Sequence, residues 1–158
     1  MNRPMDKTLM LVKPDAVERG HLGKIITRIE EKGLKIVGLK LLRLTKEKAE
    51  ELYAPHKSRP FFPGLVQYMT SAPIAALALE GPEIISQVRK LMGATNCAEA
   101  EPGTIRGDYG ISIQNNLVHG SDSLESARRE LAVFFSEKEI LDYRRALDQW
   151  LFPSEAKV

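Results

Sequence analysis

The sequence has few of the features that mark secreted or membrane proteins. It contains one cysteine, Cys97, so no intramolecular disulfide can form, and this suits a reducing compartment. No apolar run approaches the roughly 20 residues that a membrane-spanning helix needs. Residues 1–6 are polar and lack the apolar core of a secretory signal. We therefore expect a soluble, cytoplasmic protein with no membrane partner.

The usual sequence motifs for phosphate binding are also missing. There is no GxxxxGK[ST] loop, no GxGxxG turn and no kinase-type His-Arg-Asp loop, and residues 20–25 have the wrong spacing and no hydroxyl for the first of these. The net charge of +2 is too small to indicate nucleic-acid binding by itself. Any phosphoryl chemistry must therefore use another route.

Nothing in the composition divides the chain. It has no tandem repeat, low-complexity tract or Gly/Ser linker, and apolar residues make up 43% of its 158 residues. A chain of this length fits one compact core. We predict a single domain over residues 1–158, with its core at about 7–150 and a C-terminal tail at 151–158.

Apolar periodicity predicts the secondary structure. Strands are expected at residues 8–12, 34–44 and 73–79, and within 111–119. Helices are expected at residues 22–32 before Gly33, at 45–53, from Pro60, from Pro82 to Gly93, from Ser121 and over 137–151, with a long ordered loop at 94–110. With 45–69 set aside as a helical insertion, the order is β-α-β twice. This is the α+β, ferredoxin-like split βαβ plan, a four-stranded antiparallel sheet with helices on one face.

The segment from Asn115 to Ser123 holds the strongest catalytic candidate. His119 follows a strand and precedes Gly120, which permits a tight turn and a close ligand. Backbone N–H groups at the start of the next helix favour an anion there. One imidazole nitrogen can attack phosphorus while the other donates to a carboxylate, for which Glu130 is the candidate. These residues alone are equally compatible with a structural histidine.

Two cationic residues stand out from the Lys and Arg side chains of a solvated surface. Lys13 directly follows an apolar strand, a usual place for a binding site. Arg106 lies between Gly103 and Gly107, which let the backbone approach a ligand. Two unit charges 4 Å apart interact by about 4 kcal/mol at an effective dielectric of 20. A few cations in a partly closed cleft could therefore hold a triphosphate.

Phe61 and Phe62 lie at a predicted helix start, between Pro60 and Pro63. Taken alone, the pair favours two core side chains. If one of them is exposed at this rigid turn, it can stack on a nucleobase of any kind.

Taken together, these segments resemble the nucleoside diphosphate kinase family over about residues 7–150. The resemblance is carried by separated motifs in the same order: Lys13-Pro14-Asp15, Tyr53 ahead of Arg59-Pro60-Phe61-Phe62, Gly93-Ala94-Thr95-Asn96, the PGTIRGD run at 102–108, and Asn115-Asn116 through His119-Gly120-Ser121-Asp122-Ser123. The His-Gly-Ser-Asp sequence with the upstream PGTIRGD run is especially specific. Cys97 stands where the family usually has proline, and Ile113 replaces the more usual valine.

The resemblance implies a role for each site residue. His119 is the residue phosphorylated, and Glu130 orients its imidazole. The transferring phosphoryl group and the turn around it are assigned to Lys13, Tyr53, Ser121 and Asp122. Three residues are assigned to the nucleotide phosphates: Arg89, Thr95 and Arg106. Asn116 and Lys13 are assigned to the sugar hydroxyls. The base is placed between Phe61 and Ile113, with Leu65 at the rim of the cleft.

The implied reaction is transfer of the γ-phosphoryl group from a nucleoside triphosphate to a nucleoside diphosphate. It is ping-pong through a phosphohistidine at His119, with broad base specificity, and serves NTP and dNTP synthesis. Mg²⁺ is expected on the nucleotide phosphates, with no metal ligated by the protein itself. Family members form homo-oligomers, and we expect a hexamer rather than a tetramer, with the Pro102 loop and the tail beyond Trp150 as interface elements.

Two other functions are alternatives to phosphoryl transfer between nucleotides. A phosphohydrolase would pass the phosphohistidine to water, and would have no reason to recognise a second nucleotide. A ferredoxin-like RNA-binding module would carry an aromatic-rich strand motif, whereas the predicted strands carry aliphatic residues. No obligate nucleic-acid partner is expected.

Overall fold

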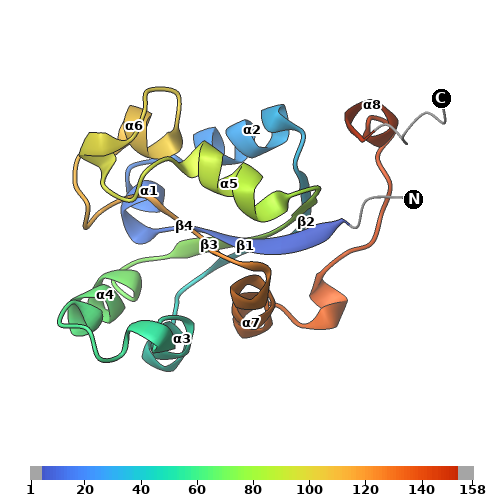
Figure 1. The fold of residues 1–158 in the computed structure, drawn as a ribbon. Coiled ribbons are helices and arrows are strands. Elements are labelled where there is room, and N and C mark those ends of the chain that lie inside the picture. The colour runs from blue at the N-terminus through green and yellow to red at the C-terminus, as the bar shows by residue number, and fades with distance from the viewer. Residues whose placement is uncertain (1–4, 153–158) are drawn as a thin grey trace.

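The computed structural model describes residues 5–152 and contains a four-stranded antiparallel sheet in the order β2-β3-β1-β4 (Figure 1). The strands are β1 (Asp6–Val12), β2 (Lys35–Leu42), β3 (Ile74–Gly81) and β4 (Val118–Gly120). This order confirms the predicted ferredoxin-like fold. Of the predicted tail at 151–158, the part from 153 onward lies outside the described residues. Among those residues, no helix is long and apolar enough to cross a membrane.

Helices cover both faces of the sheet. Figure 1 shows α2 (Leu22–Lys32) and α5 (Ile84–Met92) on one side, with α3 (Lys46–Leu52), α4 (Phe62–Met69) and α7 (Leu124–Phe134) on the other. The prediction of helices on one face is therefore wrong. The reason lies in β1, where Leu9 and Leu11 join one core cluster and Met10 and Val12 join the other. A sheet that is apolar on both faces needs cover on both.

Local sequence signals set several helix ends. Gly33 ends α2 in the left-handed conformation, with φ 91°, as predicted. The Thr45 side chain caps α3 by accepting from the backbone N–H of Lys48, and Ser123 caps α7 by accepting from Ser126. The first cap confirms the expected helix start at Thr45, whereas α7 begins at Leu124, three residues after the predicted start at Ser121.

Other predicted boundaries differ from the structure. Helix α4 begins at Phe62, so Pro63 rather than Pro60 occupies its first turn. Helix α5 begins at Ile84, two residues after Pro82. Two short helices were not predicted. Helix α1 (Pro14–Glu18) directly follows Lys13, and α6 (Ile105–Tyr109) lies within the expected loop at 94–110. Helix α6 forms because Thr104 caps it through the N–H of Gly107.

The predicted helix over residues 137–151 is wrong. Only a 3-10 turn at Glu137–Glu139 and the short α8 (Asp148–Leu151) are helical there. Between them the chain runs along β2, where the N–H of Leu141 donates to the carbonyl of Val37 at 2.8 Å. The Tyr143 hydroxyl donates to the carbonyl of Ile36 at 2.6 Å. Hydrogen bonds to the outer edge of the sheet replace those that a helix would make within itself.

Candidate active site

His119 lies in β4, an edge strand, and its side chain is 20% exposed. Its Nε2 is hydrogen-bonded to Oε1 of Glu130, which α7 brings to the site. Because a carboxylate accepts, this bond places the imidazole proton on Nε2 and leaves the Nδ1 lone pair free. Burial lowers the pKa of His119 below 6.5, against the opposing effect of Glu130. The ring is therefore neutral at pH 7 and can act as a nucleophile.

The carboxylate of Glu130 is fixed in turn by its neighbours. Glu130 is buried, and the hydroxyl of Ser121 donates to the same Oε1 at 3.4 Å. The guanidinium of Arg129 lies 3.8 Å from the other carboxylate oxygen. The orientation of the imidazole is thus set by a carboxylate with little freedom to rotate.

Tyr53 lies beside the imidazole at the end of α3. Its ring meets that of His119 edge-on, with the centroids 5.9 Å apart and the planes at 86°. The Tyr53 hydroxyl is buried and has no hydrogen-bond partner within the described part of the chain. Burial raises the pKa of Tyr53, so the hydroxyl keeps its proton. A buried donor without a partner, next to the His119 imidazole, is available to an oxygen of a ligand.

Lys13, Asn116 and Thr95 form one connected group. The Lys13 ammonium donates to Oδ1 of Asn116 at 2.8 Å, and Nδ2 of Asn116 donates to the carbonyl of Thr95 at 3.1 Å. Lys13 and Asn116 are both buried. Burial, together with the charge of Arg106, lowers the pKa of Lys13 to about 8. The ammonium is therefore charged at pH 7 and close to its titration range.

Arg106 holds three backbone segments with one guanidinium. Nε donates to the carbonyl of Asn116 at 3.1 Å, Nη1 to that of Gly93 at 3.0 Å, and Nη2 to that of Val118 at 2.7 Å. The Asn116 carbonyl lies in the turn before β4, that of Gly93 at the end of α5, and that of Val118 in β4 itself. Burial lowers the pKa of Arg106, but a guanidinium starts so high that it stays charged. Arg106 is therefore both a positive charge and a brace for the site.

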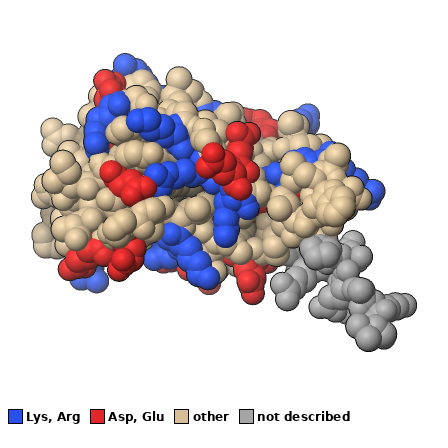
Figure 2. Space-filling view, turned by 90° about the horizontal axis from the view of Figure 1, so that it is seen from above, with Lys and Arg blue, Asp and Glu red and all other residues tan. Residues whose placement is uncertain are grey.

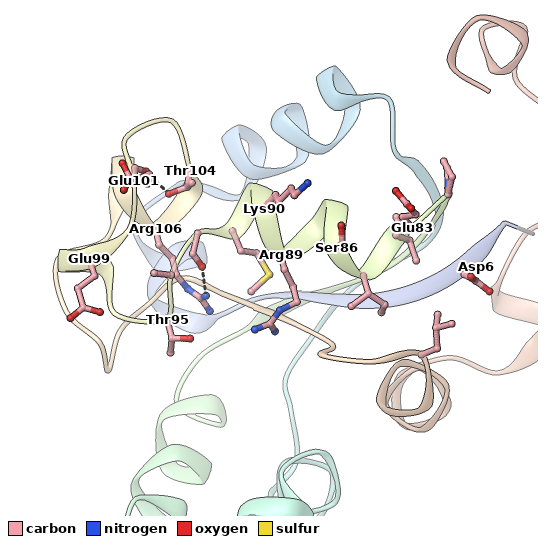
Figure 3. Close-up of a pocket in the computed structure, with 17 residues that line it drawn as sticks. Asp6, Glu83, Ser86, Arg89, Lys90, Thr95, Glu99, Glu101, Thr104 and Arg106 are labelled. Carbon is pink, nitrogen blue, oxygen red and sulfur yellow. Dashed lines mark hydrogen bonds between the residues drawn. The ribbon is translucent and has the colours of Figure 1, made fainter. Parts of the chain in front are cut away.

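A cavity of about 1000 Å³ runs along α5 and meets the site at its cationic end. Figure 3 shows Arg89 from α5 and Arg106 from α6 pointing their guanidinium groups toward the same space, with Thr95 beside Arg106. The lining of this cavity, as far as the structure describes it, does not include His119. The position of this cavity alone therefore does not identify His119 as part of the site.

The predicted base-binding residues lie apart from this cluster. Phe61 precedes α4 and is 54% exposed, whereas Phe62 is in the core, so the pair divides into one exposed and one buried ring. Ile113 is 56% exposed, and Leu65 is half-buried against the core. No hydrogen bond or ring contact joins Phe61 or Ile113 to His119 within the described residues. An exposed Phe61 is what stacking on a base requires.

Two residues near the site had no predicted role. Asp15, the second residue of α1, accepts a hydrogen bond from the hydroxyl of Tyr68 in α4. Its other oxygen accepts the backbone N–H of Leu117 at 3.2 Å. Asp15 is part of the Lys13-Pro14-Asp15 motif, so a carboxylate directly after a strand was the available signal. Tyr68 gave no signal, because its spacing in α4 indicates only a half-buried side chain.

The donor set does not favour a metal held by the protein alone. Residues 5–152 contain no group of three or more His, Cys, Asp or Glu side chains placed to hold a metal ion. The groups gathered beside His119 are mainly cations and neutral donors. This arrangement suits an anion, or a metal ion that is already bound to an anionic ligand.

Comparison with known proteins identifies relatives over nearly the whole chain. The family model described as nucleoside diphosphate kinase matches residues 6–140. The nucleoside diphosphate kinase of Carboxydothermus hydrogenoformans is 52% identical over 148 residues, which are 94% of this chain and 99% of that protein. That of Listeria monocytogenes is 52% identical over 147 residues, 93% of this chain and all of that protein (100%).

Solved structures agree with these sequence relatives. A nucleoside diphosphate kinase from Halobacterium salinarum, in complex with CDP, has a TM-score of 0.92 and 48% identity, covering 94% of this chain and 99% of that one. The Aquifex aeolicus nucleoside diphosphate kinase has a TM-score of 0.85 and 45% identity, covering 87% of this chain and 100% of that one.

Proposed function

Because this chain belongs to the nucleoside diphosphate kinase family, we propose that His119 is the residue that carries the phosphoryl group in its reaction. The enzyme is a phosphotransferase that moves the γ-phosphoryl group of a nucleoside triphosphate to a nucleoside diphosphate by a ping-pong mechanism. The observation that supports His119 is its bond to Glu130 through Nε2, since this bond leaves Nδ1 as the reactive nitrogen.

In the first half-reaction, the Nδ1 lone pair attacks the γ-phosphorus, and the bond to the bridging oxygen breaks. The diphosphate leaves with that electron pair, and a phosphorus–nitrogen bond remains. In the second half-reaction, a terminal oxygen of another diphosphate attacks the same phosphorus, and the electron pair returns to Nδ1. Glu130 holds the proton on Nε2 throughout and stabilises the positive charge that develops on the ring.

The other residues bind and orient in this proposal. Lys13, Arg89 and Arg106 bring positive charge to the phosphates, where most catalysis of phosphoryl transfer originates. The free hydroxyl of Tyr53 donates to the transferring group. Asn116 and Lys13 reach the sugar, Thr95 a phosphate, and Phe61 and Ile113 stack on the base, with Leu65 at the rim. Because donor and acceptor use one site, contacts common to all nucleotides serve both half-reactions.

We place Mg²⁺ on the nucleotide phosphates rather than in a protein cage. The cationic residues beside His119 fit a phosphate chain, and the described residues hold no carboxylate cluster for the ion. When bound, Mg²⁺ supplies further neutralisation of phosphate charge.

We also propose a homo-oligomer, with a hexamer favoured over a tetramer. Ile111 is 85% exposed and Trp150 is 81% exposed, and contacts between subunits would bury these two apolar side chains. The tail beyond Phe152, which we predict to contribute, lies outside the described residues. A single domain over residues 1–158 and a cytoplasmic location also stay predictions.

The phosphoenzyme itself provides the test. We expect mass spectrometry of protein treated with ATP and kept from acid to find one phosphoryl adduct on His119. This adduct should persist in buffer and disappear rapidly when a nucleoside diphosphate is added. Rapid loss to buffer alone would instead support a phosphohydrolase, and no adduct at His119 would contradict the proposal.

The surface gives little support to the RNA-binding alternative. On the face that carries α2, α5 and α6, basic side chains alternate with acidic ones instead of forming a continuous basic patch (Figure 2). A protein that binds the RNA backbone usually presents a basic stripe.

The pH dependence of kcat/KM should show the titration of Lys13. Its pKa is lowered to about 8, so the charged form is lost as the pH rises through that value. We expect kcat/KM, which reports the free enzyme, to fall above about pH 8. On the acid side, the lowered pKa of His119 keeps the ring neutral, so activity should hold to below pH 6.5.

A Lys13→Arg variant is the matched control, because its charge does not titrate in this range. Its activity can be lower, but its profile should lose the alkaline limb. An unchanged alkaline limb in this variant would assign the titration to another group.

A further inference from the structure

Asp15 connects two parts of the site that lie far apart in the sequence. One carboxylate oxygen accepts from the Tyr68 hydroxyl on α4, and the other accepts from the Leu117 N–H at 3.2 Å. Both oxygens are therefore used within the protein. Burial and the carboxylate of Asp15 raise the pKa of Tyr68, so its hydroxyl stays a donor.

The backbone that Asp15 contacts is strained. Leu117 has φ 69°, in the left-handed region that is disfavoured for a residue with a side chain, and it is completely buried. Its carbonyl accepts the N–H of Lys13 at 2.8 Å. Without Asp15, the N–H of Leu117 would be buried without a partner, which is unfavourable. Asp15 therefore stabilises a conformation that leucine would not otherwise adopt.

This turn places residues on both sides of Leu117. Asn116 precedes it. The carbonyl of Asn116 accepts a hydrogen bond from Nε of Arg106, and its side-chain Oδ1 accepts one from the Lys13 ammonium. His119 follows two residues later. On the other side of Asp15, α4 carries Leu65 and directly follows Phe61, the residues assigned to the base. A single carboxylate thus joins the segment that binds the base to the one that carries the nucleophile.

We propose that Asp15 and Tyr68 are positioning residues that hold α4 against the turn at Asn116–His119, an inference that rests on the proposed function. We call this pair the Asp15–Tyr68 latch. The hydrogen bond from Tyr68 to Asp15 sets the distance between the base and the nucleophile. The hydrogen bond from the Leu117 N–H to Asp15 sets the orientation of the turn and so the positions of Asn116 and His119. Neither residue touches the reacting atoms.

Tyr68→Phe removes only the hydroxyl and keeps the packed ring. We expect the KM for nucleotides to rise about tenfold, the lower end for one lost hydrogen bond to a charged group, with kcat changed by less than about twofold. Asp15→Ala also frees the Leu117 N–H, so the single-turnover rate of His119 phosphorylation should fall about tenfold or more as well. Asp15→Asn should recover most of that rate, because its amide oxygen can still accept from Leu117.

Tyr143→Phe is the matched control. It removes a hydroxyl hydrogen bond to the carbonyl of Ile36 in β2, at the opposite edge of the sheet from β4. We expect wild-type kinetics from this variant at temperatures well below its unfolding midpoint.

The latch would be overturned if Tyr68→Phe and Asp15→Ala lowered the unfolding temperature but kept wild-type KM and phosphorylation rate. The same conclusion would follow if Asp15→Asn behaved like Asp15→Ala in both measurements. Failure of the wild-type protein to form a phosphohistidine is a distinct result, because it would overturn the proposed function and the latch with it.

Discussion

Replacing His119 with glutamine is expected to lower turnover by at least about 10⁴-fold, the order seen when a covalent nucleophile is removed. Glutamine is polar and similar in size, but its amide nitrogen has no lone pair able to attack phosphorus. The fold should persist, because β4 is held by its pairing with β1 and by Arg106. Coupled-assay rates and the circular dichroism spectrum provide the two measurements.

Nucleotide binding by this variant should survive, since Lys13, Asn116 and Arg106 are unchanged. His21→Gln is the matched control. His21 stacks on Tyr109 with the ring centroids 4.7 Å apart and takes no part in the proposed reaction, so this variant should stay active. Turnover close to wild type in His119→Gln would exclude a phosphohistidine at this position.

Replacing Arg106 with alanine should affect both stability and activity. The variant leaves the carbonyls of Gly93, Asn116 and Val118 without their guanidinium donor, in a region that is largely buried. The Asn116 carbonyl still accepts the N–H of Val118 at 2.8 Å, so the loss falls on the other two carbonyls. We expect the free energy of unfolding to fall by about 2 kcal/mol or more, since each unsatisfied buried polar group costs about 1–3 kcal/mol. Loss of the positive charge should also reduce kcat/KM by about 10²-fold or more.

Arg106→Lys separates the two roles. It restores the charge but cannot donate to three carbonyls in a fixed planar arrangement. We expect it to recover part of kcat/KM while its denaturation midpoint stays close to that of Arg106→Ala. If Arg106→Ala unfolds at the wild-type denaturant concentration, the bracing role assigned to its hydrogen bonds is wrong.

The sequence predicted best those elements whose ends carry a local signal. Gly33 and Thr45 each fix a helix boundary through their own backbone or side-chain chemistry, and both act in the structure as expected. The segment at 141–145 failed because its residues suit a helix locally, whereas β2 offers carbonyls at its outer edge. That competition depends on tertiary structure, which periodicity does not contain.

In the site, too, residues within a sequence motif were predicted, and contacts that depend on tertiary structure were not. Motifs selected Lys13, Asn116, Arg106 and His119. In the structure Lys13 and Arg106 are hydrogen-bonded to Asn116, and His119, in the strand that follows this turn, is hydrogen-bonded to Glu130. The left-handed conformation of Leu117 could not be predicted, because leucine rarely adopts it. The Tyr68–Asp15 bond was also unpredictable, since it joins residues 53 positions apart through a geometry that only the fold creates.

The register of β1 fixes the position of His119, the proposed nucleophile. Leu11 in β1 is paired with His119, while Met10 and Val12 beside it point into the opposite interior. If β1 slipped by one residue, its side chains would exchange between two interiors that are each packed around side chains of other sizes, and the resulting cavities and overpacking oppose such a slip. The position of the proposed nucleophile therefore depends on apolar side chains on both faces of the neighbouring strand, none of which needs to contact the nucleotide.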